Sequence, residues 1–469
     1  MKELFSPRWF KSRASESLPD EALRRNIERA TETALKKRAD VVGAFPEWES
    51  YRTAARAVKE HVLENLSSYL ASFEEHARAN GSTVLYARDG VEACALVMDI
   101  VLSAGTRTVV KSKSMTSEEI GLSAALGRSG IQAVETDLGE YIVQLAGEPP
   151  SHITAPALHK SRRDIGRLFE QKLGLPYSDE PETLTAVARS VLRDRFFEAG
   201  VGISGVNFGL ADSGAICVVE NEGNARMATT LPPVHIALMG VEKLLPDMRC
   251  LALFLDMLAR SATGQRLSSY TSIIRGPKRA DEWDGPDVLY IIILDNGRTD
   301  IFADSRFRSV LSCIRCGACL NVCPVYRVVG GHAYGSAYPG PIGAVLAPFF
   351  HGKEDGRHLP YASSLCGACA EICPVRIDIP RLLLLHRGET VRERRAPLIE
   401  RFLMKAYACV VKRPALYALT GHLLRAFAPL ATDEHGLLRI PTRAKTRTFP
   451  APAEKTFREI WKEEGIGST

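Results

Sequence analysis

The sequence lacks several features that would assign the protein to a special class. None of its apolar runs reaches the ~18 residues that a transmembrane helix needs. Its 60 basic residues exceed its 55 acidic residues by too few to indicate nucleic acid binding. Residues 1–20 contain no apolar segment typical of a signal peptide. We therefore expect a cytoplasmic protein with neither a membrane span nor a nucleic acid partner.

Cysteine is too scarce for a disulfide scaffold, with 11 in a chain of 469 residues. Most of these cysteines nevertheless fall between positions 313 and 373. Such clustering in a reducing compartment indicates a metal site. The remaining cysteines stand singly in apolar or helical surroundings, which favours small buried side chains without a functional role: Cys94, Cys217, Cys250 and Cys409.

The length predicts more than one domain, because a single hydrophobic core stops growing at roughly 250–300 residues. Hydrophobic residues make up 45% and charged residues 25% of the chain, as in ordinary globular proteins. Changes of pattern along the chain predict four regions: an N-terminal helical region at 1–80, an α/β domain at 81–300, a cysteine-rich domain at 301–390, and C-terminal helices with an extended arm at 391–469.

Short β-rich runs alternate with helical runs between residues 81 and 300. This alternation predicts an α/β domain with a parallel sheet. The predicted strands lie at 83–87, 107–112, 131–138, 214–223, 234–240 and 288–297, and the helices between them at 91–105, 117–130 and 182–200. Helical periodicity also covers 20–80 and 381–430. One further short helix is predicted within 454–465, after an arm at 441–455.

The cysteine spacing is that of a bacterial ferredoxin. Cys313, Cys316 and Cys319 are separated by two residues each, and Cys323 follows after three more, directly before proline. In such a run three thiolates hold one four-iron cluster, while the fourth ligates a neighbouring cluster. Structural zinc is the alternative, but zinc sites with four thiolates typically use two separated Cys-x-x-Cys pairs.

A second, incomplete copy of this run follows at Cys366, Cys369 and Cys373. The cysteine that it lacks would stand at Ser363. Crossed ligation predicts one cluster on Cys313, Cys316, Cys319 and Cys373, and a second on Cys323, Cys366 and Cys369. The fourth bond of the second cluster is left open: Ser363 or another group supplies it, a partner or small thiol does, or the site holds three irons. We favour two four-iron clusters in a helical ferredoxin domain.

Four segments, together with the cysteine pattern, carry a family resemblance: VVKSKSMTSEEIG at 109–121, ETDLGEYIVQLAGEPPSHITAPALHK at 135–160, VENEGNARMATTLPPVHIA at 219–237 and YPGPIGAVL at 338–346. On these segments the chain resembles the lactate utilization protein B family. The resemblance implies an electron-transfer component of a three-protein cytoplasmic system that oxidises L-lactate to pyruvate. It also implies two 4Fe-4S clusters and an α/β domain, the LUD domain, similar in fold to CoA transferases and sugar-phosphate isomerases.

The same resemblance implies two partner subunits, a cysteine-rich iron-sulfur protein and a smaller LUD-domain protein, with an unidentified electron acceptor. Electron relay through the clusters is therefore the favoured function. One alternative is that the α/β domain catalyses acyl- or sugar-phosphate-type chemistry centred on Glu222. A second is a scaffold or oxygen sensor with an unstable cluster.

Catalytic candidates in the α/β domain are few. Glu220 and Glu222 follow an apolar strand, where open α/β sheets bind ligands, and Glu222 could act as a base or nucleophile. The competing interpretation is that Glu220 and Asn224 are polar residues of a solvated turn. Other polar side chains of interest are Lys111, Ser112, His152, His159, Asn221, Asn224 and His235, although buried histidines are more often structural. No G-x-G-x-x-G follows a strand, so neither a dinucleotide nor a flavin site is indicated.

Overall fold

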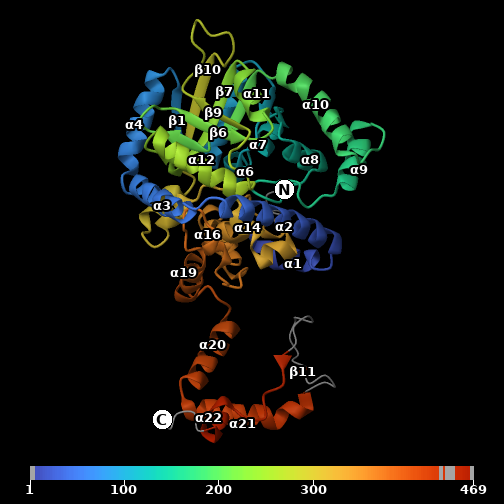
Figure 1. Cartoon of the computed structure of the whole chain (residues 1–469), viewed down its shortest axis with the longest axis vertical. Helices are drawn as coiled ribbons and strands as arrows, with labels where there is room; N and C mark the ends of the chain where they lie inside the picture. The colour runs from blue at the N-terminus through green and yellow to red at the C-terminus, as the bar shows by residue number, and fades with distance from the viewer. Residues whose placement is uncertain (1–5, 432–436, 439–448, 465–469) are drawn as a thin grey trace. The chain divides into compact units, whose positions relative to one another are not determined.

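The computed structural model describes residues 6–431, 437–438 and 449–464. The chain divides into two compact units, Met1–Glu389 and Thr390–Thr469. The first unit contains the two larger sheets and the cysteine-rich segment, and the second is mainly helical (Figure 1). None of the helices within the described ranges is long and apolar enough to cross a membrane.

A parallel six-stranded sheet forms the centre of the first unit (Figure 1). Its strand order is β1-β10-β7-β4-β2-β3, and every neighbouring pair runs parallel. The bounds are β1 (Thr83–Ala87), β2 (Thr108–Lys111), β3 (Gln132–Glu135), β4 (Val201–Gly205), β7 (Val234–Gly240) and β10 (Val288–Leu294). The predicted α/β class is confirmed. β4 was not predicted, because its sequence VGISG has too few bulky residues to signal a strand.

Helices cover both faces of this sheet, which explains why β7 and β10 are almost continuously apolar. On one face, α5 (Gly90–Ser103) and α7 (Leu122–Arg128) pack on Ile203, Ile236 and Ile292. On the other, Phe73 of α4 (Leu66–Ala79) packs near Ile291. Further helices around the sheet are α6 (Met115–Ile120), α8 (Leu138–Ala146), α9 (Arg162–Leu173), α10 (Pro181–Glu198) and α11 (Asn224–Thr230).

A second, mixed sheet has the order β8-β5-β6-β9. Its strands are β5 (Phe208–Leu210), β6 (Ile216–Glu220), β8 (Leu244–Leu245) and β9 (Tyr270–Ile274). The strand predicted at 214–223 is β6, but its expected place in the parallel sheet is wrong, since β6 pairs antiparallel with β5 and β9. The turn between β5 and β6 requires Gly214, whose φ is 65° and whose missing side chain would collide with the backbone of Ala77.

The N-terminal helices and the cysteine-rich segment share one hydrophobic core. Ile27, Leu63 and Phe254 belong to the same buried cluster as Tyr326 and Leu346. The helices involved are α1 (Phe10–Ser17), α2 (Glu21–Gly43), α3 (Trp48–Glu64), α12 (Met248–Ala262), α13 (Arg298–Ala303), α14 (Ala318–Asn321), α15 (Pro324–Val329), α16 (Gly340–Phe350), α17 (Gly352–Gly356), α18 (Ala368–Glu371) and α19 (Ile379–Arg392). Short 3₁₀ turns are η1 (Pro7–Trp9), η2 (Val241–Lys243), η3 (Arg308–Ser312), η4 (His332–Tyr334) and η5 (Leu359–Tyr361). The boundaries near 80, 300 and 390 stay a prediction.

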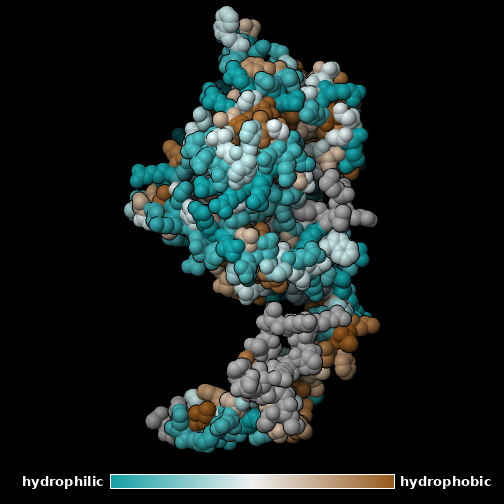
Figure 2. Space-filling view, turned by 90° about the vertical axis from the view of Figure 1, so that its right-hand side faces the viewer, coloured by the Kyte–Doolittle hydropathy of each residue, from teal (hydrophilic) through white to brown (hydrophobic). Residues whose placement is uncertain are grey.

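The second unit contains α20 (Leu398–Val411), α21 (Pro414–Ala431), the short strands β11 (Leu437–Leu438) and β12 (Phe449–Pro450), and α22 (Phe457–Glu463). α22 lies where the short helix was predicted, whereas residues 441–448 of the predicted arm lie outside the described residues. Large apolar side chains such as Phe402 and Leu424 are exposed on α20 and α21, and Figure 2 shows hydrophobic surface on this unit. Cys409 is also exposed, which corrects its expected burial; Cys94 and Cys217 are buried.

A buried ion network joins the α/β part of the first unit to the cysteine-rich segment. Arg298 donates to Glu242 at 2.7 Å and to both oxygens of Glu119 at 2.8 Å. The Tyr338 hydroxyl donates to Glu119 at 2.9 Å. Burial alone would raise the pKa of Glu242, but Arg298 and Arg315 hold it at about 2. Glu242 therefore stays ionised inside the protein.

We expect Arg298→Met to lower the free energy of unfolding by about 3–5 kcal/mol, because it leaves two buried carboxylates without their cation. The measurement is urea unfolding of the full chain followed by tryptophan fluorescence. Arg195→Met is the matched control, since Arg195 forms only a surface pair with Glu198 and should change stability by under about 1 kcal/mol. Equal midpoints for the two variants would contradict a structural role for the network.

Candidate iron-sulfur centre

The first cysteine loop is shaped by backbone geometry that turns its N–H groups toward sulfur. Arg315 and Gly317 adopt positive φ angles of 60° and 77°. The Arg315 N–H donates to the Sγ atom of Cys313 at 3.4 Å. Backbone N–H groups likewise lower the pKa of the Cys316 and Cys319 thiols against the larger, raising effect of burial. Such N–H donors stabilise thiolates and tune the potential of a cluster.

The second loop repeats this geometry. Leu365 and Gly367 take positive φ angles of 57° and 88°, at the positions equivalent to Arg315 and Gly317. The Leu365 N–H donates to the Ser363 Oγ at 3.1 Å. The Arg315 N–H makes the equivalent contact with Cys313 in the first loop. Ser363 therefore has the local setting of a cluster cysteine.

The thiols gather into two groups. Cys313, Cys316, Cys319 and Cys373 line one cavity, whose other walls include Ile342 and Val375. Burial is the main cause that raises the pKa of the Cys369 thiol to about 12, and the nearby thiols of Cys323 and Cys366 add to the rise. These three thiols therefore form the other group. Cys366 is exposed, whereas Cys316, Cys323, Cys369 and Cys373 are buried.

The residues present fit iron-sulfur clusters. Closely spaced thiols oppose one another's ionisation, as they do at Cys316, where burial raises the pKa to about 12 and Cys313 and Cys373 add to the effect. Thiolates are the form that ligates iron. Convergent thiols, N–H donors and apolar walls together are what a buried cluster requires.

Arginines of the N-terminal helices hold the second loop. Arg52 of α3 donates to the carbonyl oxygen of Cys373 at 3.0 Å and to that of Glu371 at 2.7 Å. Arg38 of α2 donates to the carbonyl of Ile372 at 3.1 Å. Arg52 is only 8% exposed and is oriented by Glu49 at 2.9 Å. These contacts are not predictable from the sequence, because more than 300 residues separate Arg52 from the loop.

The carboxylate candidates of the α/β domain have mainly structural contacts. Both oxygens of Glu220 accept backbone N–H groups at 2.7 Å, from Ala225 and Arg226 at the start of α11. One oxygen of Glu222 accepts the Leu138 N–H at 3.2 Å. Burial and the neighbouring Asp137 raise the pKa of Glu222. Both glutamates nevertheless line one cavity with Ser112, Asn221 and Asn224.

Lys111 and His235 are buried and hydrogen-bonded. The Lys111 Nζ contacts Ser117, Glu118 and Glu135 at 2.9–3.1 Å. Burial raises the pKa of Glu135 to about 7, although Lys111 opposes this. The His235 Nε2 lies 2.8 Å from the Ser204 hydroxyl. The Lys111 Nζ and the His235 Nε2 thus have hydrogen-bond partners within the protein, which favours structural roles for both residues.

His152 and His159 lie at the junction with the cysteine-rich segment. The His152 Nδ1 accepts the Thr154 and Ala155 N–H groups at 3.1 and 3.2 Å. His159 pairs with Glu148 at 2.7 Å, and the ligand atoms of these two residues and His332 lie within 4.8 Å of one another. Lys160 also pairs with Glu148, at 2.8 Å, and supplies positive charge there. We assign no metal to this group.

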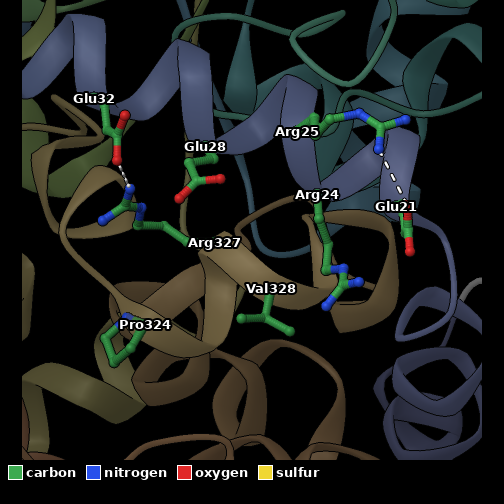
Figure 3. A pocket seen from close by; sticks show the side chains of 8 residues that line it. All are labelled: Glu21, Arg24, Arg25, Glu28, Glu32, Pro324, Arg327 and Val328. Atoms are coloured by element: carbon green, nitrogen blue, oxygen red, sulfur yellow. Dashed lines mark hydrogen bonds and ion pairs between the residues drawn. The ribbon is translucent and has the colours of Figure 1, made fainter.

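A surface pocket of about 550 Å³ lies between α2 and α15, next to Pro324, which follows Cys323 (Figure 3). Four of its six charged lining side chains form ion pairs with each other. Arg327 pairs with Glu32 at 2.8 Å, and Arg25 with Glu21 at 3.2 Å (Figure 3). Because these charges are already paired, we assign no ligand to this pocket.

Family models match three consecutive parts of the chain: the LUD domain at 70–294, the 4Fe-4S dicluster domain at 309–377, and "Lactate utilisation protein B, C-terminal" at 387–466. Curated relatives named lactate utilization protein B match almost the whole chain. That of Bacillus licheniformis is 44% identical over 461 residues, covering 97% of this chain and 96% of the relative. That of Bacillus subtilis is 43% identical over 456 residues, covering 96% and 95%. The dicluster match supports iron-sulfur clusters as the cofactor.

We expect Arg52→Met to weaken iron retention at the loop that carries Cys373, because it removes the donors to three loop carbonyls. The measurement is iron and sulfide per chain after anaerobic reconstitution and gel filtration. Arg56→Met is the control: Arg56 lies about one turn later on α3 and pairs only with Glu60 at the surface. If both variants retain wild-type iron, Arg52 does not support the cluster.

Proposed function

The chain belongs to the lactate utilization protein B family, and on this premise we propose that it relays single electrons through two 4Fe-4S clusters as L-lactate is oxidised to pyruvate. The observation that carries the proposal is the grouping of the seven clustered cysteines into a set of four and a set of three. When bound, such clusters accept and release single electrons without bonding a substrate.

We assign the ligands by the crossed pattern. The first cluster takes Cys313, Cys316, Cys319 and Cys373, and the second takes Cys323, Cys366 and Cys369. Each loop thus supplies one cysteine to the other loop's cluster, which keeps the two clusters adjacent. The exposure of Cys366 favours the second cluster as the one that exchanges electrons with an outside protein.

We further propose that the Ser363 Oγ completes the second cluster. Its support is the repeated turn, in which Ser363 and Cys313 accept equivalent N–H groups from Leu365 and Arg315. Arg387 also donates to the Ser363 carbonyl oxygen at 3.1 Å and fixes this part of the loop. An oxygen ligand is harder than sulfur, so this cluster should differ in potential from one held by four thiolates.

The partners in this proposal are the cysteine-rich iron-sulfur subunit and the small LUD-domain subunit of the same cytoplasmic system, with an acceptor of unknown identity. Catalysis centred on Glu222 is the less favoured alternative. Glu222 uses one oxygen to accept the Leu138 N–H, and its ionisable neighbours are Asp137, Lys113 and Glu220.

We expect Ser363→Ala to convert the second cluster to a three-iron form, because an alanine side chain cannot ligate iron. Ser363→Cys should restore four irons. EPR of the oxidised protein, in which a three-iron cluster is paramagnetic, measures the difference beside iron counts. Ser190→Ala, at an exposed position of α10, is the control. A wild-type iron count without a three-iron EPR signal in Ser363→Ala would rule out Ser363 as the ligand.

Electron relay predicts that lactate bleaches the visible absorbance of the reconstituted clusters, but only when both partner subunits are present. The measurement is anaerobic absorbance spectroscopy of the three proteins after lactate addition, with dithionite as the reference for full reduction. Cys316→Ser should lose most of the lactate-dependent change. Clusters that dithionite reduces but lactate with both partners never does would refute the relay.

A further inference from the structure

A cavity of about 240 Å³ connects the α/β domain with the first cysteine loop. Its walls include residues 112–116 after β2, 205–207 after β4 and 218–222 at the end of β6. Lys243, Arg315 and Tyr338 form its other side. Arg315 also lines the cavity of the first cysteine group, so the two cavities share this residue as a wall.

Arg315 is buried with two unused hydrogen-bond donors. It is 8% exposed, and its guanidinium lies over the Tyr338 ring at 4.6 Å. Its Nη2 has a long contact of 3.5 Å with Glu242, whereas Nε and Nη1 have no partner among the described residues. Leaving buried donors unsatisfied is unfavourable, and more so for charged groups. A ligand that accepts from them would remove this cost.

Lys243 adds a second positive charge to the same side of the cavity. Its Nζ forms no hydrogen bond or ion pair within the described part of the chain, although Glu242 is nearby. The carboxylates among the lining residues accept backbone N–H groups, Glu220 from Ala225, Glu222 from Leu138 and Asp137 from Glu140, while Lys113 is a further lining cation. The polar side chains of the cavity that remain free to bind a ligand are therefore cations, and they suit an anion.

The size and the remaining walls limit what this anion is. The cavity is smaller than the ~300–1,000 Å³ of typical ligand pockets, which excludes nucleotides and flavins. Leu258, Ala259 and Ala262 give it an apolar patch, and Asn221 and Asn224 offer polar groups. We propose that this cavity binds a small 2-hydroxy or 2-keto monocarboxylate, with its carboxylate against Arg315 and Lys243. The choice of acid rests on the proposed function.

This location couples binding to the state of the first cluster. An anion at Arg315 cancels positive charge next to the Cys313 group, which disfavours adding an electron there. Ligand binding therefore lowers the reduction potential of that cluster, and by thermodynamic reciprocity reduction weakens ligand binding. The product would thus leave more readily after the cluster accepts an electron.

The test is calorimetric titration of the anaerobic, cluster-loaded chain with pyruvate. Lys243→Met should weaken pyruvate binding at least tenfold per cluster-loaded chain, with the iron content of each preparation measured alongside. Lys278→Met is the matched control, because Lys278 pairs with Asp287 at the surface and is not among the cavity's lining residues. Redox titration should show a lower potential with pyruvate for the wild type and a smaller shift for Lys243→Met.

Acetate and inorganic phosphate are titrated into the same protein as comparison ligands. Weaker binding of both supports a site that recognises the oxygen next to the carboxylate. Phosphate binding as tight as pyruvate, or equal pyruvate affinity in Lys243→Met and wild type, overturns the assignment. The absence of pyruvate binding also overturns the assignment. If lactate still bleaches the clusters in the three-protein assay in that case, only this inference fails and the electron relay stands.

Discussion

The arrangement of the first unit depends on the ion pairs that the buried Arg298 forms. This arginine stands at the start of α13, directly after the parallel sheet ends, and binds Glu119 and Glu242 of the α/β part. Tyr338 and the Phe350 ring, against which Arg298 also lies at 5.2 Å, come from the cysteine-rich segment. A buried ion pair adds little net stability but penalises any arrangement that separates its members. Arg298 thereby fixes the position of one part relative to the other.

The charges around this network suit a neighbouring iron-sulfur cluster. Lys59, Lys243, Arg298 and Arg315 surround Glu242, which leaves an excess of positive charge. Lys59 is buried and donates to the Glu242 carbonyl oxygen, and burial lowers its pKa to about 8. Four thiolates on a cluster bring negative charge to the same place. The excess of cations thus compensates the proposed cluster at Cys313, and both groups are more stable together than either would be alone.

The sequence predicts what local chemistry determines. Cysteine spacing identifies the candidate ligands, because each loop is short enough for its own backbone to set the geometry, and the repeated turn at Arg315 and Leu365 has the same origin. Continuous apolar runs identify β7 and β10 for a similar reason. Strand pairing is not local: β6 has the composition of a parallel strand, yet its tight turn at Gly214 directs it to β5. The contacts of Arg52 and Arg38 depend on distant packing and leave no trace in the sequence.

The two proposed clusters differ in surroundings, and this difference gives the relay a direction. The group that includes Cys316 and Cys373 lies under α3 and shares Arg315 with the internal cavity, while the other group includes the exposed Cys366. A buried cluster surrounded by cations holds an electron more readily than one with fewer cations beside it. The electron must nevertheless leave through the exposed cluster, because outer-sphere transfer needs close approach of the acceptor. An anion bound at Arg315 lowers the potential of the buried cluster and so makes this outward step easier, which links the cavity to the relay.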